Sequence, residues 1–404
     1  MKILMVNKFL HPNGGSETYI FKLGEELIRQ GHEVQYFGME HEKRVVGNRA
    51  EVYTDNMDFH TGKLQKLFYP FKIIYSKEAY QKMWQVLEDF QPDVVHLNNI
   101  NFQLTPSVID AVKKYKKKTG REVKLIATAH DYQWVCPNHM LMIPSSKQMC
   151  FACEGGKYRN CSKNKCIHNS LVKSMLGSVE AYFYKWNEIY KEIDKVICPS
   201  EFLNVKLSTN PVFKGKTITM HNFVTADKMK QSKIKLPKLP KEYVIYFGRY
   251  AEEKGISTLL KVCKKLPHID FVFAGNGPLE SEVNKVENII NVGFQTGSNL
   301  KQLISNAKFF VFPSQWYENC PFAVIESQLL GTPVVASDLG GTKELVAHKQ
   351  TGELYLGEDV ETLEKTIETL WQDDEKVRKY RANCKQVQFD SLEEYCKKIL
   401  ELYR

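Results

Sequence analysis

The chain has 404 residues, 43% of them hydrophobic and 25% charged, a composition that excludes a disordered or collagen-like protein. This length favours two domains, and the sequence shows no signal peptide and no run of about 18 apolar residues, which predicts a cytoplasmic protein. The net charge of +9 arises entirely in residues 1–222, which carry 31 Lys and Arg against 22 Asp and Glu, and this indicates an anionic partner or a solvated basic surface.

The first half of the chain alternates short apolar runs with helical patterns. An apolar strand from Lys2 is followed by a turn at residues 11–15 and by a helix over 16–30, with Ser16 as its N-cap and Gly31 as its stop. Helical patterns separate most of the later apolar runs, as a parallel sheet requires. These further strands are predicted at 33–37, 93–97, 124–129, 195–198 and 217–221.

A lysine-rich segment at 223–241, with Pro237 and Pro240, is interpreted as a linker. After it the same alternation resumes and ends in a long helical tail from about Val360. The strands of this half are predicted at 243–247, 269–274, 289–292, 309–312 and 333–336. The fold class is therefore α/β, with doubly wound domains at 1–222 and 242–404 that face a central cleft.

Glycines and cations follow the predicted strands of the second half. Gly248 and Arg249 end one strand, and Lys254 stands near the start of the next helix, where a cation and helix N-terminal amides suit a diphosphate. The turn Gly275-Asn276-Gly277 lets a nucleotide approach the backbone closely. Taken singly, such glycines are more often plain turn residues, and such cations are more often salt-bridge partners.

Two carboxylates form the next motif. Glu318 lies in a predicted loop, and Glu326 follows eight positions later in a helix that Pro321 can start. Eight positions are a little over two helical turns, so both acids can address one cleft. Such a pair can accept hydrogen bonds from sugar and ribose hydroxyls without a metal ion.

The order of these motifs resembles glycosyltransferase family four. Further parts of the resemblance are Pro313-Ser314, the run Gly331-Thr332-Pro333-Val334-Val335-Ala336, Gly340-Gly341 and the earlier Gly14-Gly15, 128–131 and Pro199-Ser200. The resemblance covers almost the whole chain and points to a subset with a cysteine-rich insert. It implies a GT-B fold of two Rossmann-like domains, an acceptor-side domain first and a nucleotide-sugar domain second, with the last helix crossing back to the first. It also implies a retaining reaction that needs no metal.

The resemblance also implies roles for individual residues. Arg249 and Lys254 would hold the donor diphosphate and stabilise the leaving group, Glu318 would bind the donor sugar, and His130 would hydrogen-bond to that sugar near the acceptor. These four are the expected catalytic residues. The expected donor-binding residues are Gly14, Gly15, Gly248, Gly275, Asn276, Gly277, Pro321, Phe322, Ala323 and, at the ribose, Glu326.

The predicted function is hexosyl transfer from a nucleotide diphosphate sugar, with uridine diphosphate donors expected first and guanosine diphosphate donors second, to a saccharide or lipid-linked saccharide in cell-surface polysaccharide synthesis. A sugar-nucleotide 2-epimerase of similar fold and a non-catalytic sugar-nucleotide-binding protein are the alternatives. No recognised nucleic-acid-binding module surrounds the lysines at 113–118, so a solvated helix face and no nucleic-acid partner are expected.

Three positions depart from the family pattern. Asn319-Cys320-Pro321 stands where a glycine-rich turn is common, and Asn98 stands where a second histidine is common. The hinge asparagine, Asn222, lacks the usual following glycine. These departures affect the expected shape of the sugar pocket and the closure of the domains more than the reaction class.

Five cysteines gather in an insert at about 136–168, directly after His130. Cys150 and Cys153 have metal-ligand spacing, and Cys161 with Cys166 could complete a structural zinc site. Cys136, as a fifth cysteine, blurs this set, and free thiols or a conditional disulfide are the alternatives; the spacing does not match ferredoxin-type iron–sulfur patterns. In either case the insert is expected to shape the acceptor site.

Residues 59–75 mix Lys63, Lys66 and Lys72 with aromatic and aliphatic side chains. This mixture predicts a peripheral contact with an anionic membrane on its inner face, through which a lipid-linked acceptor would arrive. A buried segment packed on the sheet is the equally weighted alternative.

Overall fold

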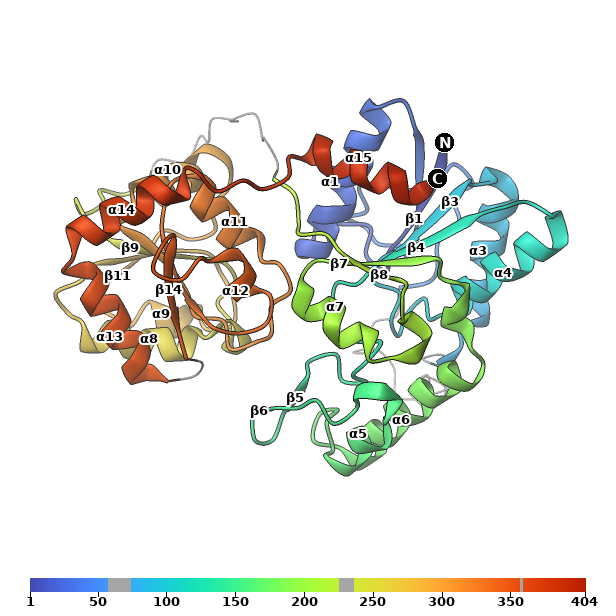
Figure 1. Cartoon of the computed structure of the whole chain (residues 1–404), viewed down its shortest axis with the longest axis horizontal. Helices are drawn as coiled ribbons and strands as arrows, with labels where there is room; N and C mark the ends of the chain where they lie inside the picture. Colours follow the sequence, from blue (N-terminus) through green and yellow to red (C-terminus); the bar gives the residue numbers. More distant parts are fainter. Residues whose placement is uncertain (57–73, 225–235, 357–358) are drawn as a thin grey trace. The chain divides into compact units, whose positions relative to one another are not determined.

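The computed structural model describes residues 1–56, 74–224, 236–356 and 359–404, and Figure 1 shows two α/β units. Unit 1 comprises Met1–His221 and Leu392–Arg404, and unit 2 comprises Asn222–Ser391. The chain therefore passes between the units twice. Val224 and Ser391, which flank the two passages, form a parallel bridge in unit 2.

Unit 1 contains a parallel six-stranded sheet in the order β2-β1-β3-β4-β7-β8. Its strands are short and mostly buried, because helices cover them; α3 packs beside α4, and α1 beside α15 (Figure 1). The elements are β1 (Lys2–Val6), α1 (Gly15–Arg29), β2 (Glu33–Phe37), α3 (Lys77–Phe90), β3 (Val94–Leu97), α4 (Ser107–Thr119), β4 (Lys124–Thr128), β5 (Met142–Ile143), β6 (Gln148–Met149), α5 (Arg159–Lys163), α6 (Leu171–Trp186), β7 (Lys195–Cys198), α7 (Glu201–Ser208), β8 (Thr217–Thr219) and α15 (Leu392–Tyr403).

The C-terminal helix α15 is joined to this sheet by buried polar contacts. The hydroxyl of Tyr395 lies 3.0 Å from that of Tyr19 on α1. The hydroxyl of Tyr403 lies 2.6 Å from Nδ1 of His96 on β3. Because both contacts are buried, they fix α15 against unit 1 with more geometric precision than apolar packing alone would give.

Unit 2 contains a second parallel six-stranded sheet, in the order β11-β10-β9-β12-β13-β14. Both orders are those of doubly wound folds, whose ligands bind at the carboxyl edge where the strand order reverses. The elements are β9 (Val244–Phe247), α8 (Ile256–Lys265), β10 (Phe271–Ala274), α9 (Glu280–Val283), β11 (Ile289–Asn291), α10 (Gly297–Asn306), β12 (Phe309–Phe312), α11 (Phe322–Leu329), β13 (Val334–Ser337), α12 (Thr342–Leu345), β14 (Gly352–Tyr355), α13 (Val360–Trp371) and α14 (Asp374–Cys384).

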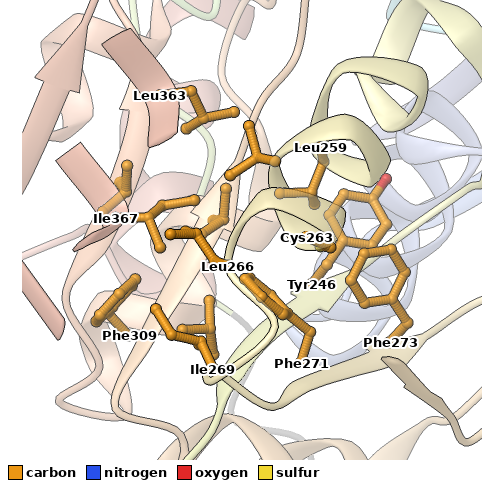
Figure 2. Packing of buried hydrophobic residues seen from close by; sticks show 14 of the residues in the cluster. Tyr246, Leu259, Cys263, Leu266, Ile269, Phe271, Phe273, Phe309, Leu363 and Ile367 are labelled. Carbon is orange, nitrogen blue, oxygen red and sulfur yellow. The ribbon is translucent and has the colours of Figure 1, made fainter. Parts of the chain in front are cut away.

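One face of this sheet packs against α8 and α13. Figure 2 shows residues of this core, with Tyr246, Phe271 and Phe273 from β9 and β10, Leu259 and Cys263 from α8, and Leu363 and Ile367 from α13. Burying each large apolar side chain contributes roughly 1.5–3 kcal/mol. This core holds the strands rigid, so that the loops at their carboxyl edge have a fixed base.

The predicted strand positions of both halves match the sheets, but some local predictions were wrong. Helix α1 begins at Gly15 with Gly14 as its N-cap, because the Ser16 hydroxyl contacts Glu17 and Asn99 instead of capping the helix. The long tail is three helices, since Asp373 caps a new helix, α14, and residues 385–391 separate α14 from α15.

Strand β14 was missed because Glu353 interrupts its apolar pattern. That carboxylate is buried and bound by Lys376 at 2.5 Å and by the hydroxyl of Tyr380 at 2.7 Å. A buried charge with two partners can occupy a strand that sequence patterning would reject.

The residues Lys63, Lys66 and Lys72 of the predicted membrane segment, and residues 225–235 of the predicted linker, lie outside the described residues. Within the described part of the chain, no helix combines the length and the apolar character that crossing a bilayer requires.

Candidate active site

The strand order of unit 2 reverses between β9 and β12, which are hydrogen-bonded neighbours. The loop after β9 carries Gly248, Arg249 and the short 3₁₀ helix Glu252–Lys254, and the loop after β12 carries Ser314 and Glu318. Both loops therefore leave the same edge of the sheet on the two sides of the reversal. This is the position at which doubly wound domains bind nucleotides.

Lys254 and Glu318 meet there. The ammonium of Lys254 lies 2.6 Å from Oε1 of Glu318, and the Ser314 hydroxyl donates to the same oxygen at 2.8 Å. The side chains of Lys254 and Glu318 are 32% and 16% exposed, so the pair faces solvent at one end only. Lys254 has three donor hydrogens, and one pair with Glu318 leaves capacity for a second anionic group.

Arg249 is placed differently. Its side chain is 65% exposed, and its guanidinium lies 3.7 Å from the carboxylate of Glu253. An exposed pair of this length contributes little to folding. The charge of Arg249, in the same loop as Lys254, is therefore available to a ligand.

Glycines bring the first two loops of unit 2 into contact. A Cβ at Gly275 would lie 1.9 Å from the Gly248 carbonyl oxygen, and one at Gly277, whose φ is +153°, would lie 2.5 Å from the Tyr250 carbonyl oxygen. The backbone NH of Tyr250 donates to the Asn276 carbonyl at 2.8 Å. No side chain fits at either glycine, so the predicted close-approach turn is also required by the fold itself.

Helix α11 presents the remaining donor-site candidates. Pro321 is its N-cap residue, Phe322 and Ala323 form its first turn, and Glu326 lies one turn further on, half-buried. The Glu318 carbonyl accepts from the Gly341 NH at 2.7 Å, which ties the loop before α11 to the loop after β13. Glu326 thus belongs to the helix that follows Glu318, as the spacing predicted.

Two departures from the family pattern contact each other. The Asn222 side-chain amide donates to the Cys320 carbonyl at 2.7 Å, and its backbone NH lies 3.2 Å from the Cys320 sulfur. The rings of Phe223 and Phe322 pack edge to face at 5.9 Å. The start of unit 2 is therefore attached to the entrance of α11.

In unit 1 the strand order reverses between β1 and β3, and the N-terminus of α1 is tied to that point. The Asn7 amide donates to the buried Glu17 carboxylate at 3.0 Å, and the Asn99 amide donates to the Ser16 hydroxyl at 2.9 Å. Gly14 and Gly15 lie at this helix start and are exposed. Their backbone is therefore held in place from behind while remaining open to a ligand.

His130 follows β4 at the same edge of unit 1. Its Nε2 lies 2.9 Å from Oδ1 of Asn98, whose amide group donates in turn to the His96 carbonyl at 3.3 Å. Because that donation orients the Asn98 oxygen toward the ring, His130 must carry its proton on Nε2. Burial lowers the pKa of His130 to about 4, so the ring is neutral at physiological pH.

Two more residues connect His130 to the interior. Its ring packs edge to face on Tyr19, with centroids 5.2 Å apart. The Thr128 hydroxyl, two residues before His130, lies 2.8 Å from Nε2 of His96 and 3.1 Å from the hydroxyl of Tyr19. This hydrogen-bond network also includes Tyr395 and Tyr403, so the C-terminal helix helps to fix the position of His130.

The zinc site predicted at Cys150, Cys153, Cys161 and Cys166 stays a prediction, and nothing in the described residues supports it. Across the described residues, which include the whole insert, no three His, Cys, Asp or Glu side chains form a group that could hold a metal. All the cysteines are free, and Cys153, Cys161 and Cys166 pack around Tyr158 as a small apolar cluster. Burial raises the pKa of the Cys153 thiol to about 12, in keeping with its place in this apolar cluster.

The sequence analysis named Ser314 and Asn98 in the family pattern but gave neither a role in the site. The signal for Ser314 was its position four residues before Glu318, directly after a strand. The signal for Asn98 was its place at the end of β3, beside the reversal of strand order, where a polar residue in an otherwise apolar run needs a partner. The lysines at 113–118 lie on α4, where Lys113, Lys114 and Lys118 each have a carboxylate neighbour, as a solvated helix face would.

Comparison with known sequences identifies the family. Residues 13–228 match the model of Glycosyltransferase Family 4, and residues 227–387 match that of Glycosyl transferases group 1. The chain is 23% identical over 382 residues to an uncharacterized 42.6 kDa protein in the cps region of Klebsiella pneumoniae, covering 90% of this chain and 92% of that one. It is 33% identical over 141 residues to the sulfoquinovosyl transferase SQD2 of Arabidopsis thaliana, covering 33% and 28%.

Solved structures show the same fold. A sucrose-phosphate synthase from Thermosynechococcus elongatus superposes with a TM-score of 0.69 at 19% identity, covering 100% of this chain and 98% of that one. Anabaena Alr3699/HepE, solved in complex with UDP and glucose, superposes with a TM-score of 0.64 at 17% identity, covering 99% of each chain. The predicted family and fold are confirmed: this chain belongs to glycosyltransferase family 4, and it is a glycosyltransferase of the GT-B fold that uses a nucleotide sugar.

Proposed function

We propose that the enzyme transfers a hexosyl group, with retention of configuration, from a uridine diphosphate sugar to a saccharide or lipid-linked saccharide in the synthesis of a cell-surface polysaccharide. Unit 2 binds the donor, and unit 1 supplies residues on the acceptor side. The observation that carries this proposal is the group of Lys254, Glu318 and Ser314 at the strand-order reversal of unit 2.

The charges of this group fit a diphosphate sugar. Lys254 and the exposed Arg249 neutralise the two phosphates and the negative charge that develops on the leaving group. These two cations do the work that a metal ion does elsewhere, so no metal is required. Glu318 accepts hydrogen bonds from the sugar hydroxyls, and Glu326 from the ribose.

The glycine turns complete the donor site. Gly248 and Asn276 are exposed at the edge of the sheet, where a nucleotide can approach, and Gly275 and Gly277 hold their two loops close together behind them. Pro321, Phe322 and Ala323 expose the first turn of α11, whose amide groups favour an anionic ligand.

Because His130 is neutral, its surroundings in unit 1 suit an uncharged sugar better than a phosphate. With its proton fixed on Nε2 by Asn98, the ring keeps one orientation and adds no charge near the transferred group. Gly14 and Gly15, at the start of α1, allow the first loop to approach the same sugar.

The relatives support the donor and the pathway. Alr3699/HepE has been solved with UDP-glucose as well as with UDP and glucose. The full-length relative from Klebsiella pneumoniae lies in a cps region, and a partial relative is the amylovoran biosynthesis glycosyltransferase AmsK of Erwinia amylovora. These names support a polysaccharide acceptor for this chain.

The test is turnover of a panel of nucleotide sugars with saccharide and lipid-linked acceptors in chelator-treated buffer. Mass spectrometry should show one added hexosyl unit, and NMR should show that the anomeric configuration of the donor is kept. An isomerised donor in the absence of acceptor would establish the 2-epimerase instead. Donor binding without any product would establish a non-catalytic binding protein, and a strict need for added divalent metal would refute the proposed role of the two cations.

A further inference from the structure

A polar cluster joins two loops at the carboxyl edge of the unit 1 sheet. Asn101 lies in the loop after β3, and Asp131 directly follows His130 after β4. Nδ1 of His139, in the cysteine-rich insert, lies 3.1 Å from Oδ2 of Asp131, and the Asn101 amide donates to the same oxygen at 3.2 Å. Oδ1 of Asp131 accepts from the backbone NH of Gln133 at 2.8 Å. The insert is therefore attached to the residue next to His130.

The donors of this cluster can be assigned. Burial would raise the pKa of Asp131, but the charge and hydrogen bond of His139 and the charge of Lys8 outweigh burial and lower that pKa. An ionised carboxylate only accepts, so His139 carries a proton on Nδ1 and Asn101 turns its NH₂ group toward Asp131. The 3.1 Å separation of Nδ2 of Asn101 from Nδ1 of His139 is then a contact between two donors.

This orientation leaves the amide oxygen of Asn101 without a donor. Asn101 is 5% exposed, and its Oδ1 is buried and accepts no hydrogen bond from the residues that the structure describes. A buried amide oxygen normally has a hydrogen-bond partner, because leaving it bare is costly. Asp131 offers a second acceptor: a carboxylate has about four acceptor positions, the cluster uses three, and the side chain is 26% exposed.

Asn101 and His139 line a small cavity together with Gln133, Trp134 and Glu180. Its volume for water-sized groups is about 30 Å³, which is room for roughly one or two hydroxyl groups and too little for a sugar ring. Burial raises the pKa of Glu180 to about 8, so this carboxyl is largely protonated at neutral pH and adds little charge. An uncharged hydroxyl therefore suits the cavity better than a phosphate or a carboxylate.

The two loops of the cluster have unusual backbone conformations. Phe102 and Thr105 in the first loop, and His139 and Leu141 in the insert, have φ values of +62°, +61°, +66° and +50°. Residues other than glycine adopt such values rarely, and mostly where the surrounding structure imposes them. The Phe102 ring stacks on that of His139 with centroids 4.9 Å apart. The position of His139 therefore depends on both loops.

We propose that Asn101 and Asp131 form a subsite for hydroxyl groups of a saccharide acceptor, and that His139 is the positioning residue that holds this subsite in place. Oδ1 of Asn101 accepts from a hydroxyl that enters the cavity, and the carboxylate of Asp131 accepts from a neighbouring hydroxyl. The inference rests on the proposed function, because it takes the sugar beside His130 as the donor's and the ligand of the subsite as the acceptor. Through His139, the insert contributes to the choice of acceptor.

Binding of methyl glycosides tests the subsite without turnover. The methyl α-glycosides of glucose, galactose and mannose are titrated into the full chain without nucleotide, and ¹⁵N NMR follows the imidazole of His139. The glycoside that binds most tightly is then compared with its mono-deoxy analogues. The analogue that lacks the hydroxyl in the cavity should bind about tenfold more weakly, because Asn101 loses its donor.

Two results on the wild type would overturn the proposal, and neither depends on the folding of a variant. Equal affinity for all the deoxy analogues would mean that the cavity holds only water. Absence of any shift of the His139 signals with all three glycosides would mean that no saccharide binds beside it. In Asn101→Ala, the parent glycoside and the selected deoxy analogue should bind equally, and a preserved difference would refute the role of the amide oxygen.

Variants of His139 separate positioning from folding. His139→Ala removes the donor to Asp131, whereas His139→Asn keeps an amide near the place of Nδ1 and suits a positive φ. His168→Ala is the matched control, because His168 is an exposed histidine of the same insert with a φ of +51°. His139→Ala should raise the Kd for the glycoside about tenfold and leave the Kd for UDP unchanged, His139→Asn should restore most of the loss, and His168→Ala should match the wild type. Equal effects of the two alanine variants, or equal losses of glycoside and UDP binding, would show a merely structural role.

Transfer assays with nucleotide sugars keep the two proposals apart. Transfer from a nucleotide sugar, combined with equal binding of the deoxy analogues, would refute the subsite and leave the proposed function standing. Selective binding of glycosides without a product from any nucleotide sugar would support the subsite and refute the proposed transfer.

Discussion

Replacing Lys254 with methionine should weaken both donor binding and turnover. The change keeps most of the side-chain volume and removes the charge that lies 2.6 Å from Glu318. A charge-assisted hydrogen bond contributes about 1.5–3 kcal/mol, or roughly ten- to hundredfold in affinity. Because Lys254 is 32% exposed and already partly neutralised by Glu318, we expect the lower end, about a tenfold rise in the Kd for the donor.

Turnover should fall further than binding, because the leaving group gains charge as the glycosidic bond breaks. Loss of one preorganised electrostatic group costs about 10²- to 10³-fold in kcat. The fold should be little affected: the Ser314 hydroxyl still donates to Glu318, so the free energy of unfolding should change by about 1 kcal/mol or less.

Calorimetry of donor binding and steady-state transfer assays measure these two effects. Lys265→Met is the matched control, since Lys265 forms an ion pair of the same length, 2.6 Å, with Glu364 on another part of unit 2. In a Glu318→Gln background the pair is already broken, and Lys254→Met should still raise the Kd if the ammonium acts on the phosphates. Equal Kd and kcat for Lys254→Met and Lys265→Met would refute the assignment of the diphosphate site.

Three further outcomes are expected. Asn98→Ala should lower kcat while leaving the donor Kd unchanged. Because the oxygen that fixes the His130 proton on Nε2 is then gone, ¹⁵N NMR of the imidazole should show two tautomers. A single, unchanged tautomer would contradict this. Gly275→Ala should destabilise unit 2 by about 3 kcal/mol, because the new Cβ would lie 1.9 Å from the Gly248 carbonyl oxygen. The control Gly293→Ala, at a φ of +68° with open space around it, should cost about 1–2 kcal/mol. Equal unfolding curves for the two variants would refute the packing argument. Burial lowers the pKa of His96 to about 3 and that of His130 to about 4, so the unfolded chain binds more protons than the folded chain below pH 6.5. Stability that is present above pH 6.5 should therefore be lost as the pH falls toward 4, by up to about 1.4 kcal/mol per histidine and pH unit. A Tm that stays constant from pH 7 to 5 would count against this.

The strands were predictable because their apolar runs are short and bounded by turns. Phe309–Phe312 and Lys195–Cys198 have the predicted ends, since buried parallel strands are apolar on both faces. Strand β14 was not predictable in this way, because the partners of Glu353 come from α14, more than twenty residues away. Local patterns do not contain such distant compensation.

The residues of the candidate site could also be predicted from the sequence only in part. Lys254 and Glu318 could be nominated from their motifs, but their contact follows from the pairing of β9 with β12, which the sequence does not specify. The cysteines of the insert are a separate case. Cys150 and Cys153 have the spacing of metal ligands, yet the folded insert uses Cys153 as a small apolar group beside Tyr158.

The return of α15 to unit 1 makes that domain discontinuous in sequence. A fragment that ends at His221 would lack α15. Tyr19 and His96 would then lose their buried contacts with the hydroxyls of Tyr395 and Tyr403. Chimeras that exchange unit 1 between relatives must therefore transfer residues 1–221 and 392–404 together. A chimera joined once, at the first passage between the units, would pair the sheet of unit 1 with the other parent's C-terminal helix, and we expect it to lose stability even when both parents fold well.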